Sequence, residues 1–403
     1  MVFLSIDENI SKIWEQKPSL WEEKNLQTRS ELGDEIDVFA LKNFQNHILL
    51  YNPAILSKIY DSTHTIIQKE VEKWSNKTGL SSFFKEEFSS LEEKRKHKIL
   101  KSLIEEHINT ITKKLGLGVL SLSSVNFEEN KIEVKVNECA EAHETSTIGH
   151  PICFNMASIL AGEIGEKFNN WHCYEKECKA SGSNTCKFII APQEQINEEL
   201  REFLDLPSRI SFTLQGKITS MISEFKRDID YTPILEESTN RLSYILPNMD
   251  GRDRKKLGSD IHLKGFQQFY LSFLNDDFEE RGKTLYEVGF ESGKRFSKII
   301  SVMGMRSQDK LNVLPRLFDR LGMGLLELEK ESNGYKVRVK ECGYSYGLHL
   351  EEKICFYNSG FFSGMISSIE NQKFEGKETK CSGNSSEYCV HSIQPSEKEE
   401  KSD

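Results

Sequence analysis

The feature that most constrains this chain is an internal duplication, because its second half repeats the order of motifs found in its first half. The stretch LKNFQNHIL at Leu41–Leu49 corresponds to LKGFQQFYL at Leu263–Leu271. Further on, LGLG at Leu115–Gly118 corresponds to LGMG at Leu321–Gly324. A chain of 403 residues is comfortable for two domains of ordinary size. The sequence therefore predicts two copies of one module, fused head to tail.

Each copy has the pattern of a helix packed with antiparallel strands. After the glycine pair, the alternation of Ile132, Val134 and Val136 predicts a half-buried strand of a hairpin, and Val337 and Val339 repeat it. A helix follows in each copy, then a closing hairpin whose turn is rich in Gly, Ser and Asn. The helices carry glycines at equivalent places, Gly162 and Gly364, which predicts close backbone packing because a mid-helix glycine otherwise costs about 1 kcal/mol relative to Ala. The predicted fold class is α+β.

The duplication also predicts the domain limits. We expect a first module with an N-terminal helical extension over residues 1–192, a second module over residues 193–395, and a disordered tail over residues 396–403. Residues 193–262 alternate charged and apolar positions at helical spacing, so we expect helices there and no flexible linker. Fusion of two copies predicts that the modules form a pseudo-dimer within one chain, related by a pseudo-twofold axis.

Composition excludes several classes of function. A formal net charge of −10 and the absence of a basic stripe argue against direct nucleic-acid binding. The first residues, MVFLSIDENISKIW, lack the features of a secretory signal, and no run approaches the roughly 18 apolar residues of a membrane span. We therefore expect a cytoplasmic protein. Its nine cysteines then favour metal binding, because disulfides persist poorly in a reducing compartment.

Eight residues form the predicted metal sites. The pattern Glu-x-x-Cys-x7-Cys occurs twice with 203 residues between equivalent positions, and each copy has one more cysteine upstream at a helix start. Thiolates from a tight hairpin and a helix start, with a nearby carboxylate, are typical of a closed structural zinc site. We therefore predict two structural zinc ions per chain. The expected ligands are Cys153, Glu175, Cys178 and Cys186 in the first copy, and Cys355, Glu378, Cys381 and Cys389 in the second.

The alternative to zinc is a set of buried apolar cysteines beside a solvated glutamate. The glutamate is the weakest ligand of the set, and His172 and Cys173 compete with it in the first copy. The second copy has neither residue type at that place, so a geometry common to both copies favours the carboxylate. Cys139 and Cys342 end equivalent strands outside the ligand set; they are either small core residues or part of a pocket wall.

No catalytic residues are predicted. The LGxG motifs lack the third glycine of a dinucleotide site and precede a strand where such a site needs a helix. The ten histidines are scattered, and no Ser-His-Asp or Cys-His arrangement stands out. The sequence leaves catalysis open and favours a protein that is not an enzyme.

The run from the LGxG hairpin through the glycine-containing helix to Glu-x-x-Cys-x7-Cys resembles the 4-vinyl reductase domain. The likeness is clearest over Leu115–Pro192 and Leu321–Pro395. The same domain is the sensor of phenol-responsive transcription activators, and it is related in fold to subunits of the TRAPP tethering complex. In the sensors, one Cys followed by Glu, Cys and Cys binds structural zinc, which carries over to the eight residues named above.

The resemblance implies a pocket between helices and sheet that holds a small, largely apolar or aromatic molecule. The candidates for its wall are Cys139, Cys342, Phe154 and Phe356. We therefore expect a non-enzymatic ligand-binding or sensing protein, with a protein partner for its output left open. One alternative is a reductase or accessory factor that acts on a vinyl tetrapyrrole, although no nicotinamide fingerprint is visible. A second alternative is an interaction scaffold similar to tethering subunits.

Overall fold

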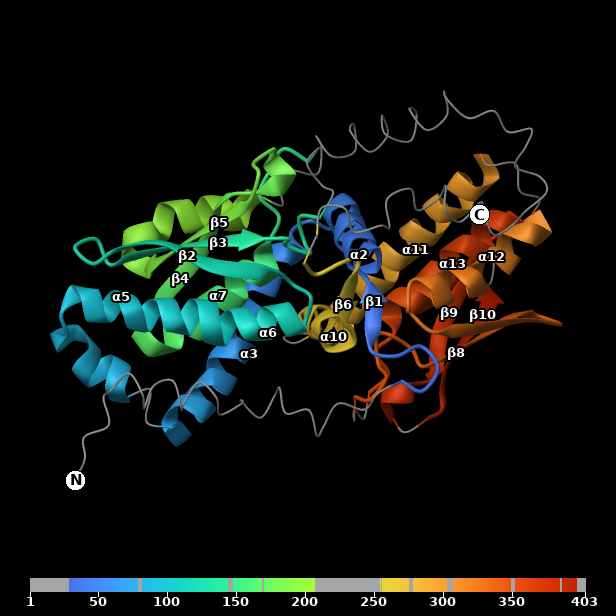
Figure 1. Cartoon of the computed structure of the whole chain (residues 1–403). Coiled ribbons are helices and arrows are strands. Elements are labelled where there is room, and N and C mark those ends of the chain that lie inside the picture. Colours follow the sequence, from blue (N-terminus) through green and yellow to red (C-terminus); the bar gives the residue numbers. More distant parts are fainter. Residues whose placement is uncertain are drawn as a thin grey trace. The chain divides into compact units, whose positions relative to one another are not determined.

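A computed structural model gives the fold of most of the chain (Figure 1). The residues that it describes are 29–78, 82–143, 148–168, 170–206, 254, 256–274, 278–302, 307–348, 352–384 and 386–396. The expected helices between the modules are described only in part, because residues 193–206 are helical and residues 207–253 lie outside the described ranges. The beginning of the chain up to residue 28 and the tail from residue 397 also lie outside them.

The described chain forms two compact units, and each unit is built from two stretches of sequence. The first unit contains residues 53–206 and 254–265. The second contains residues 29–52 and 266–396. Each unit therefore combines one copy of the duplicated body with a short segment that lies before the other body in the sequence.

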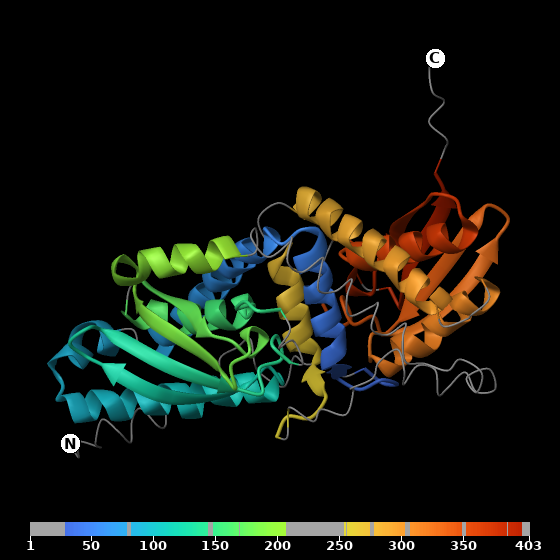
Figure 2. The same cartoon turned by 90° about the horizontal axis from the view of Figure 1, so that it is seen from above.

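The first unit is a four-stranded antiparallel sheet with helices packed on it. Its strands are ordered β2-β3-β5-β4, and the continuous helical stretch α5–η5–α6 runs beside β2 (Figures 1 and 2). Its elements in chain order are α3 (Ile55–Thr78), η3 (Phe83–Glu87), η4 (Phe88–Ser90), α5 (Glu93–Ser102), η5 (Leu103–Ile108), α6 (Asn109–Lys114), β2 (Val119–Asn126), β3 (Lys131–Asn137), α7 (Phe154–Phe168), β4 (Trp171–Glu177), η6 (Lys179–Ser181), β5 (Cys186–Pro192) and β6 (Asp260–His262).

Both faces of this sheet are covered because β5 is apolar on both sides. Val134 of β3 lies opposite Phe188, and alternate residues of a strand point to opposite faces. Ile189 and Ala191, on the other face, pack with Ile196 from helical residues 193–206. The alternation predicted for β3 is confirmed, since its buried residues are Ile132, Val134 and Val136.

The second unit repeats this sheet in the order β7-β8-β10-β9. The α+β fold class with two copies of one module is thus confirmed. The elements of the second unit are β1 (Glu35–Asp37), α2 (Val38–Tyr51), α11 (Phe278–Val302), α12 (Ser307–Arg320), β7 (Leu325–Glu331), β8 (Gly334–Lys340), α13 (Phe356–Glu370), β9 (Phe374–Lys380), η8 (Ser382–Asn384) and β10 (Tyr388–Pro395). Helix α10 (Leu263–Ser272) contributes its residues from Phe266 onward.

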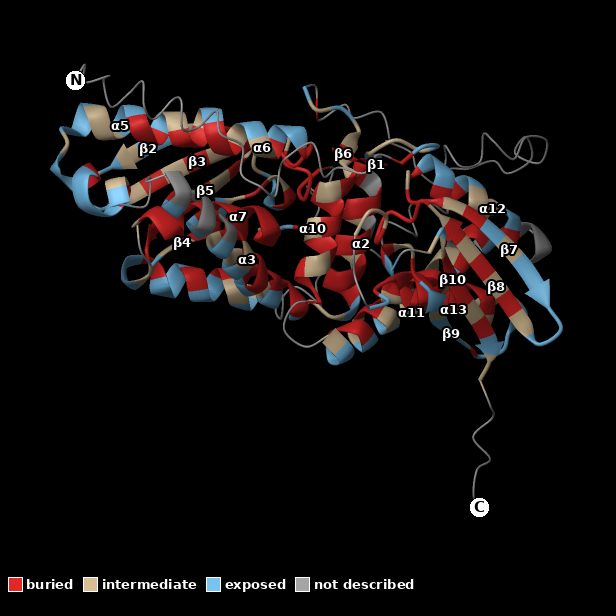
Figure 3. Cartoon of the chain, turned by 90° about the horizontal axis from the view of Figure 1, so that it is seen from below, coloured by how far each residue is buried: buried red, intermediate tan, exposed pale blue. Residues whose placement is uncertain are grey.

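Aromatic rings form the core of the second unit. Phe44 of α2 contacts the rings of Phe266, Phe269, Tyr270 and Phe273 of α10 at centroid distances of 5.3–6.3 Å. It also packs edge-on against Tyr357 of α13 at 5.0 Å. The helices α7 and α13, which pack against the two sheets, are buried over most of their length (Figure 3).

Glycines set the close packing of the central helices, as predicted. A Cβ at Gly162 of α7 would lie 2.7 Å from Cβ of Ile67 on α3. In the second unit, Gly364 of α13 lies against the carbonyl of Phe290 on α11, where no side chain fits. Gly289 and Gly293 of α11 meet α13 in the same way. The two helices therefore cross backbone to backbone.

Candidate metal centres

The first cluster brings together the four side chains predicted in the first copy. Cys153 immediately precedes α7, Glu175 lies in β4, Cys178 follows β4, and Cys186 begins β5. Their ligand atoms all lie within 4.8 Å of one another, and all four residues are buried. The three sulfur-to-sulfur distances are 3.7, 3.8 and 3.9 Å. Tetrahedral zinc with Zn–S bonds of about 2.3 Å needs sulfur atoms about 3.8 Å apart, so the thiol spacing suits zinc.

The backbone of β4 explains how its glutamate reaches the thiols. The β4–β5 register is interrupted by a bulge between Glu175 and Glu177, and such bulges redirect side chains at the end of a strand. Glu175 Oε2 accepts hydrogen bonds from the backbone N–H of Ile152 at 3.1 Å and of Cys153 at 2.9 Å. These bonds fix the carboxylate beside the loop that carries the first thiol.

The second oxygen of this carboxylate fits a role as a metal ligand. Oε1 of Glu175 is buried and has no hydrogen-bond partner among the described residues. Burial and the neighbouring Cys178 raise the pKa of Glu175 well above its usual value. A buried carboxylate oxygen without a partner is costly unless a cation or a proton meets it. A metal ion bound by the three thiolates would supply that cation.

The second cluster has the same construction. The ligand atoms of Cys355, Glu378, Cys381 and Cys389 lie within 4.8 Å of one another, and the Sγ atoms of Cys355 and Cys389 are 3.6 Å apart. Glu378 Oε2 accepts from the N–H of Cys355 at 2.8 Å, while its Oε1 is buried without a hydrogen-bond partner in the described part of the chain. Burial, followed by the charge of Cys381, raises the pKa of Glu378 to about 8.

One hydroxyl distinguishes the second cluster from the first. Ser345 Oγ lies 3.0 Å from Cys389 Sγ and 3.5 Å from Cys355 Sγ. The equivalent position in the first copy is Ala142, which has no hydroxyl. A hydroxyl that donates to a thiolate withdraws charge from it, so the two clusters have different electrostatic surroundings.

Cys139 and Cys342 lie at the edges of the clusters. Cys139 donates its S–H toward Cys153 Sγ at 3.6 Å, and Cys342 lies 3.7 Å from Cys355 Sγ. Sequence reasoning placed both outside the ligand set but did not foresee the contact. The available signal was their own repetition at the separation shared by the cluster residues. They are placed to hydrogen-bond the first thiol of each cluster.

The competing ligands of the first copy point elsewhere. Neither His172 nor Cys173 belongs to the cluster found among the described residues. His172 Nδ1 lies 3.3 Å from the hydroxyl of Tyr60, and the backbone N–H of Cys173 donates to that hydroxyl at 3.0 Å. The ring of His172 also meets that of His64 at 4.8 Å.

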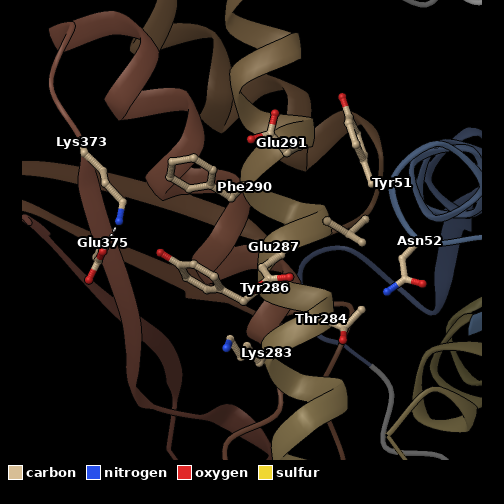
Figure 4. Close-up of a pocket in the computed structure, with 11 residues that line it drawn as sticks. Tyr51, Asn52, Lys283, Thr284, Tyr286, Glu287, Phe290, Glu291, Lys373 and Glu375 are labelled. Carbon is tan, nitrogen blue, oxygen red and sulfur yellow. Dashed lines mark ion pairs between the residues drawn. The ribbon is translucent and has the colours of Figure 1, made fainter. Parts of the chain in front are cut away.

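A cavity of about 590 Å³ lies in the second unit (Figure 4). Helix α11 forms one wall, the end of α2 a second, and the start of β9 a third. Tyr51, Tyr286 and Phe290 give it aromatic surface, and charged side chains surround them, including an ion pair of 2.7 Å between Lys373 and Glu375. The remaining lining residues are Asn52, Lys283, Thr284, Glu287, Val288 and Glu291.

The four side chains predicted for a pocket wall do not line this cavity. Phe154 is buried and stacks on Phe203 with ring centroids 4.4 Å apart. Phe356 is half-buried and meets Phe278 edge-on at 5.3 Å. A ligand contact by Cys139, Cys342, Phe154 or Phe356 stays a prediction. The cavity of Figure 4 was missed because its walls come from three distant parts of the sequence.

Among the described residues, no helix is both long and apolar enough to cross a membrane. The expectation that no such helix exists is therefore met over that part of the chain, and the cytoplasmic location stays a prediction.

Comparison with known proteins places both modules in one family. Residues 132–192 and 335–395 each match the vinyl-4-reductase domain, the domain that the sequence motifs resemble. The uncharacterized protein MJ0745 of Methanocaldococcus jannaschii is 23% identical over 166 residues, which are 41% of this chain and 83% of that protein. The uncharacterized protein MJ1642 of the same organism is 29% identical over 87 residues, which are 21% of this chain and 51% of that protein.

Solved structures resemble single modules of the chain. The phenol-responsive sensory domain of the transcription activator PoxR, solved with phenol, is 16% identical with a TM-score of 0.31, covering 40% of this chain and 91% of that domain. A vinyl-4-reductase family protein from Methanocaldococcus jannaschii is 20% identical with a TM-score of 0.28, covering 40% of this chain and 98% of that protein. With its two matched segments, the chain is a protein of the vinyl-4-reductase domain family that carries the domain in tandem.

Proposed function

We propose that this chain binds or senses a small, largely apolar or aromatic molecule without catalysing a reaction, and that each module is stabilised by one structural zinc ion. The cavity of Figure 4 is the observation that carries the binding role. Its volume of about 590 Å³ is within the range of small-molecule sites. Three aromatic rings suit an apolar body, and the lysines and glutamates around them suit one polar end of a ligand.

The proposed zinc ions are structural because four protein side chains already converge on each site. Three thiolates and one carboxylate fill a tetrahedral coordination sphere and leave no position for a substrate or an activated water. When bound, zinc would supply a cross-link between the closing hairpin and the start of α7 or α13. The residues of this chain hold the ligands in place: backbone N–H groups orient each glutamate, and Cys139 or Cys342 donates to the first thiolate.

Zinc content tests the structural part of the proposal. We expect elemental analysis of chelator-free protein to find two zinc ions per chain. Cys178→Ser and Cys381→Ser should each remove one zinc ion, because each loses a thiolate ligand. Cys173→Ser is the matched control, since Cys173 is equally buried but outside the cluster. Protein without zinc, or equal zinc loss in the control, would contradict the proposal.

Blocking the cavity tests the binding part. The probe is 1-anilinonaphthalene-8-sulfonate, which combines an apolar aromatic body with one anionic group. Thr284→Trp places an indole inside the cavity, whereas Glu279→Trp adds the same group on an exposed position of α11 outside the lining. We expect saturable fluorescence in the unmodified protein and in the control, and at least a tenfold weaker affinity in Thr284→Trp. Equal affinity in both variants would show that the cavity is not the site.

A further inference from the structure

Two short segments of the chain share a pattern that the duplication of the bodies does not explain. Arg29–Ile36 reads RSELGDEI and Arg254–Ile261 reads RKKLGSDI, so both follow Arg-x-x-Leu-Gly-x-acid-Ile. We call them the clasp segments. The first clasp segment belongs to the second unit, and the second clasp segment belongs to the first unit.

The arginine of each clasp segment is buried and binds backbone carbonyls. Arg29 is 1% exposed, and its guanidinium donates to the carbonyls of Glu35 at 2.7 Å, Glu341 at 3.3 Å and Gly322. Arg254, also 1% exposed, donates in the first unit to the carbonyls of Glu138 at 3.2 Å, Asp260 at 3.4 Å and Gly116. A buried guanidinium needs this many acceptors to offset its lost hydration.

A glutamate of each unit binds the turn that follows the arginine. The carboxylate of Glu341 accepts from the backbone N–H groups of Ser30 at 2.8 Å and Leu32 at 3.0 Å. In the first unit, Glu138 accepts from the N–H groups of Lys256 and Leu257, each at 2.9 Å. Glu138 and Glu341 both have a φ of 54°, which is rare for a residue with a side chain. Each unit thus holds its glutamate in the same strained conformation beneath a clasp segment.

The LGxG motifs form the rest of each clasp site. Gly116 and Gly322 have φ values of 68° and 65°, and a Cβ there would lie only 2.7 Å from the Asp260 carbonyl or 2.5 Å from the Glu35 carbonyl. The carbonyl before each glycine accepts from the clasp strand: Leu115 from the N–H of His262 at 3.0 Å, and Leu321 from the N–H of Asp37 at 3.1 Å. These glycines, which bind no nucleotide, allow the close approach of a clasp segment.

We propose that each unit carries a peptide-recognition site for Arg-x-x-Leu-Gly-x-acid-Ile, made by the LGxG glycine and the left-handed glutamate. Its occupant is a clasp segment of this chain. Because both sites use the same groups, the two clasp segments are interchangeable, and a second copy of the chain can supply one when the resident segment is released. The sites are therefore surfaces through which copies of this protein exchange segments.

The test uses the full chain and a fluorescein-labelled peptide of residues 27–37, read by fluorescence anisotropy. In the unmodified protein the resident segment competes at an effective concentration of roughly millimolar, so the peptide should bind weakly. Arg29→Ala weakens the resident segment and should raise peptide affinity at least tenfold. Arg338→Ala, which removes a partly exposed arginine of β8, is the matched control. Adding Glu341→Gln to Arg29→Ala should abolish binding, and unlabelled peptide 252–263 should compete.

Three outcomes would overturn the proposal. The first is peptide affinity no higher in folded Arg29→Ala than in Arg338→Ala. The second is failure of peptide 252–263 to compete, which would show that the segments are not interchangeable. If Arg29→Ala does not fold, the milder Arg29→Lys is examined by hydrogen–deuterium exchange of residues 29–37, where at least a tenfold faster exchange is expected and unchanged exchange is the third contrary outcome.

Discussion

At the scale of single residues, the two glutamates determine how each proposed zinc site is completed. One oxygen of Glu175 is held by backbone N–H groups, and the other is buried without a hydrogen-bond partner among the described residues. Cys139 contributes a thiol at the edge of the same cluster. The geometry therefore offers two candidates for the fourth position, and we propose that the carboxylate occupies it in both modules.

Substitution of these two residues separates a ligand from a hydrogen-bond donor. Glu175→Gln should weaken zinc binding at the first site by more than about 100-fold, because it removes a charged ligand. Cys139→Ser should weaken it by only about tenfold, because a serine hydroxyl still donates to Cys153. Competition with a fluorescent chelator measures both affinities. The opposite order would identify Cys139 as the ligand.

A buried histidine predicts a pH dependence of stability in the second unit. Burial, followed by the charge of Arg295, lowers the pKa of His47 to about 3, and its Nδ1 lies 2.9 Å from the hydroxyl of Tyr357. The unfolded chain regains a pKa near 6.5, so between about pH 6.5 and 3 the unfolded state binds more protons and stability falls with falling pH.

The size of this effect follows from the two pKa values. His47 should lower the free energy of unfolding by about 1.4 kcal/mol for each pH unit below 6.5. Denaturant unfolding at pH 7, 6 and 5 should therefore show a shallower pH slope for His47→Gln than for the unmodified protein. His97→Gln is the control because His97 is exposed. Parallel slopes in all three proteins would contradict the prediction.

At the scale of elements, the glycine crossing of α11 and α13 defines the core of the second unit. Gly364→Ala would normally favour a helix by about 1 kcal/mol. Here the added methyl group meets the Phe290 carbonyl, so the helices must separate. We expect a net destabilisation of about 1–3 kcal/mol in denaturant unfolding. Ser368→Ala, on a half-buried position of the same helix, should change stability little. A stabilised Gly364→Ala protein would show that the crossing is not tight.

Local pattern predicted the elements that depend on neighbours in sequence. Ile132, Val134 and Val136 alternate as a strand must, and the repeated Glu-x-x-Cys-x7-Cys spacing indicated which side chains gather at the end of each closing hairpin. The duplication supplied the helix glycines, because chance does not place them twice at equivalent positions.

Features that depend on distant contacts escaped prediction. The thiol contact of Cys139 requires the end of β3 to meet the start of α7. The clasp segments are separated from their sites by most of the chain, as Arg29 and Glu341 illustrate. Nothing in a local pattern reveals that an arginine will bind carbonyls that lie hundreds of residues away, although the repeated Arg-x-x-Leu-Gly was visible in the sequence.

At the scale of the whole molecule, the membership of the two units is reciprocal. The segment before the first body belongs to the second unit, and the segment before the second body belongs to the first. Duplication of a module that exchanged such segments between two copies would lead to this reciprocity within one chain. The reciprocity gives the predicted pseudo-dimer a physical basis, since exchange of equivalent segments is the relation that a twofold axis generates.

We therefore predict that a pseudo-twofold axis relates the two units, as expected from the duplication alone. A twofold relation makes both exchanges equivalent, whereas pure translation would send both segments in the same direction and leave one clasp site without a partner. An experimental structure of the full chain, by crystallography or electron microscopy, measures the rotation that superposes β2–β5 on β7–β10. We expect a rotation near 180°. A rotation near zero with a large translation would contradict the prediction, and the clasp contacts within each unit would then need another origin.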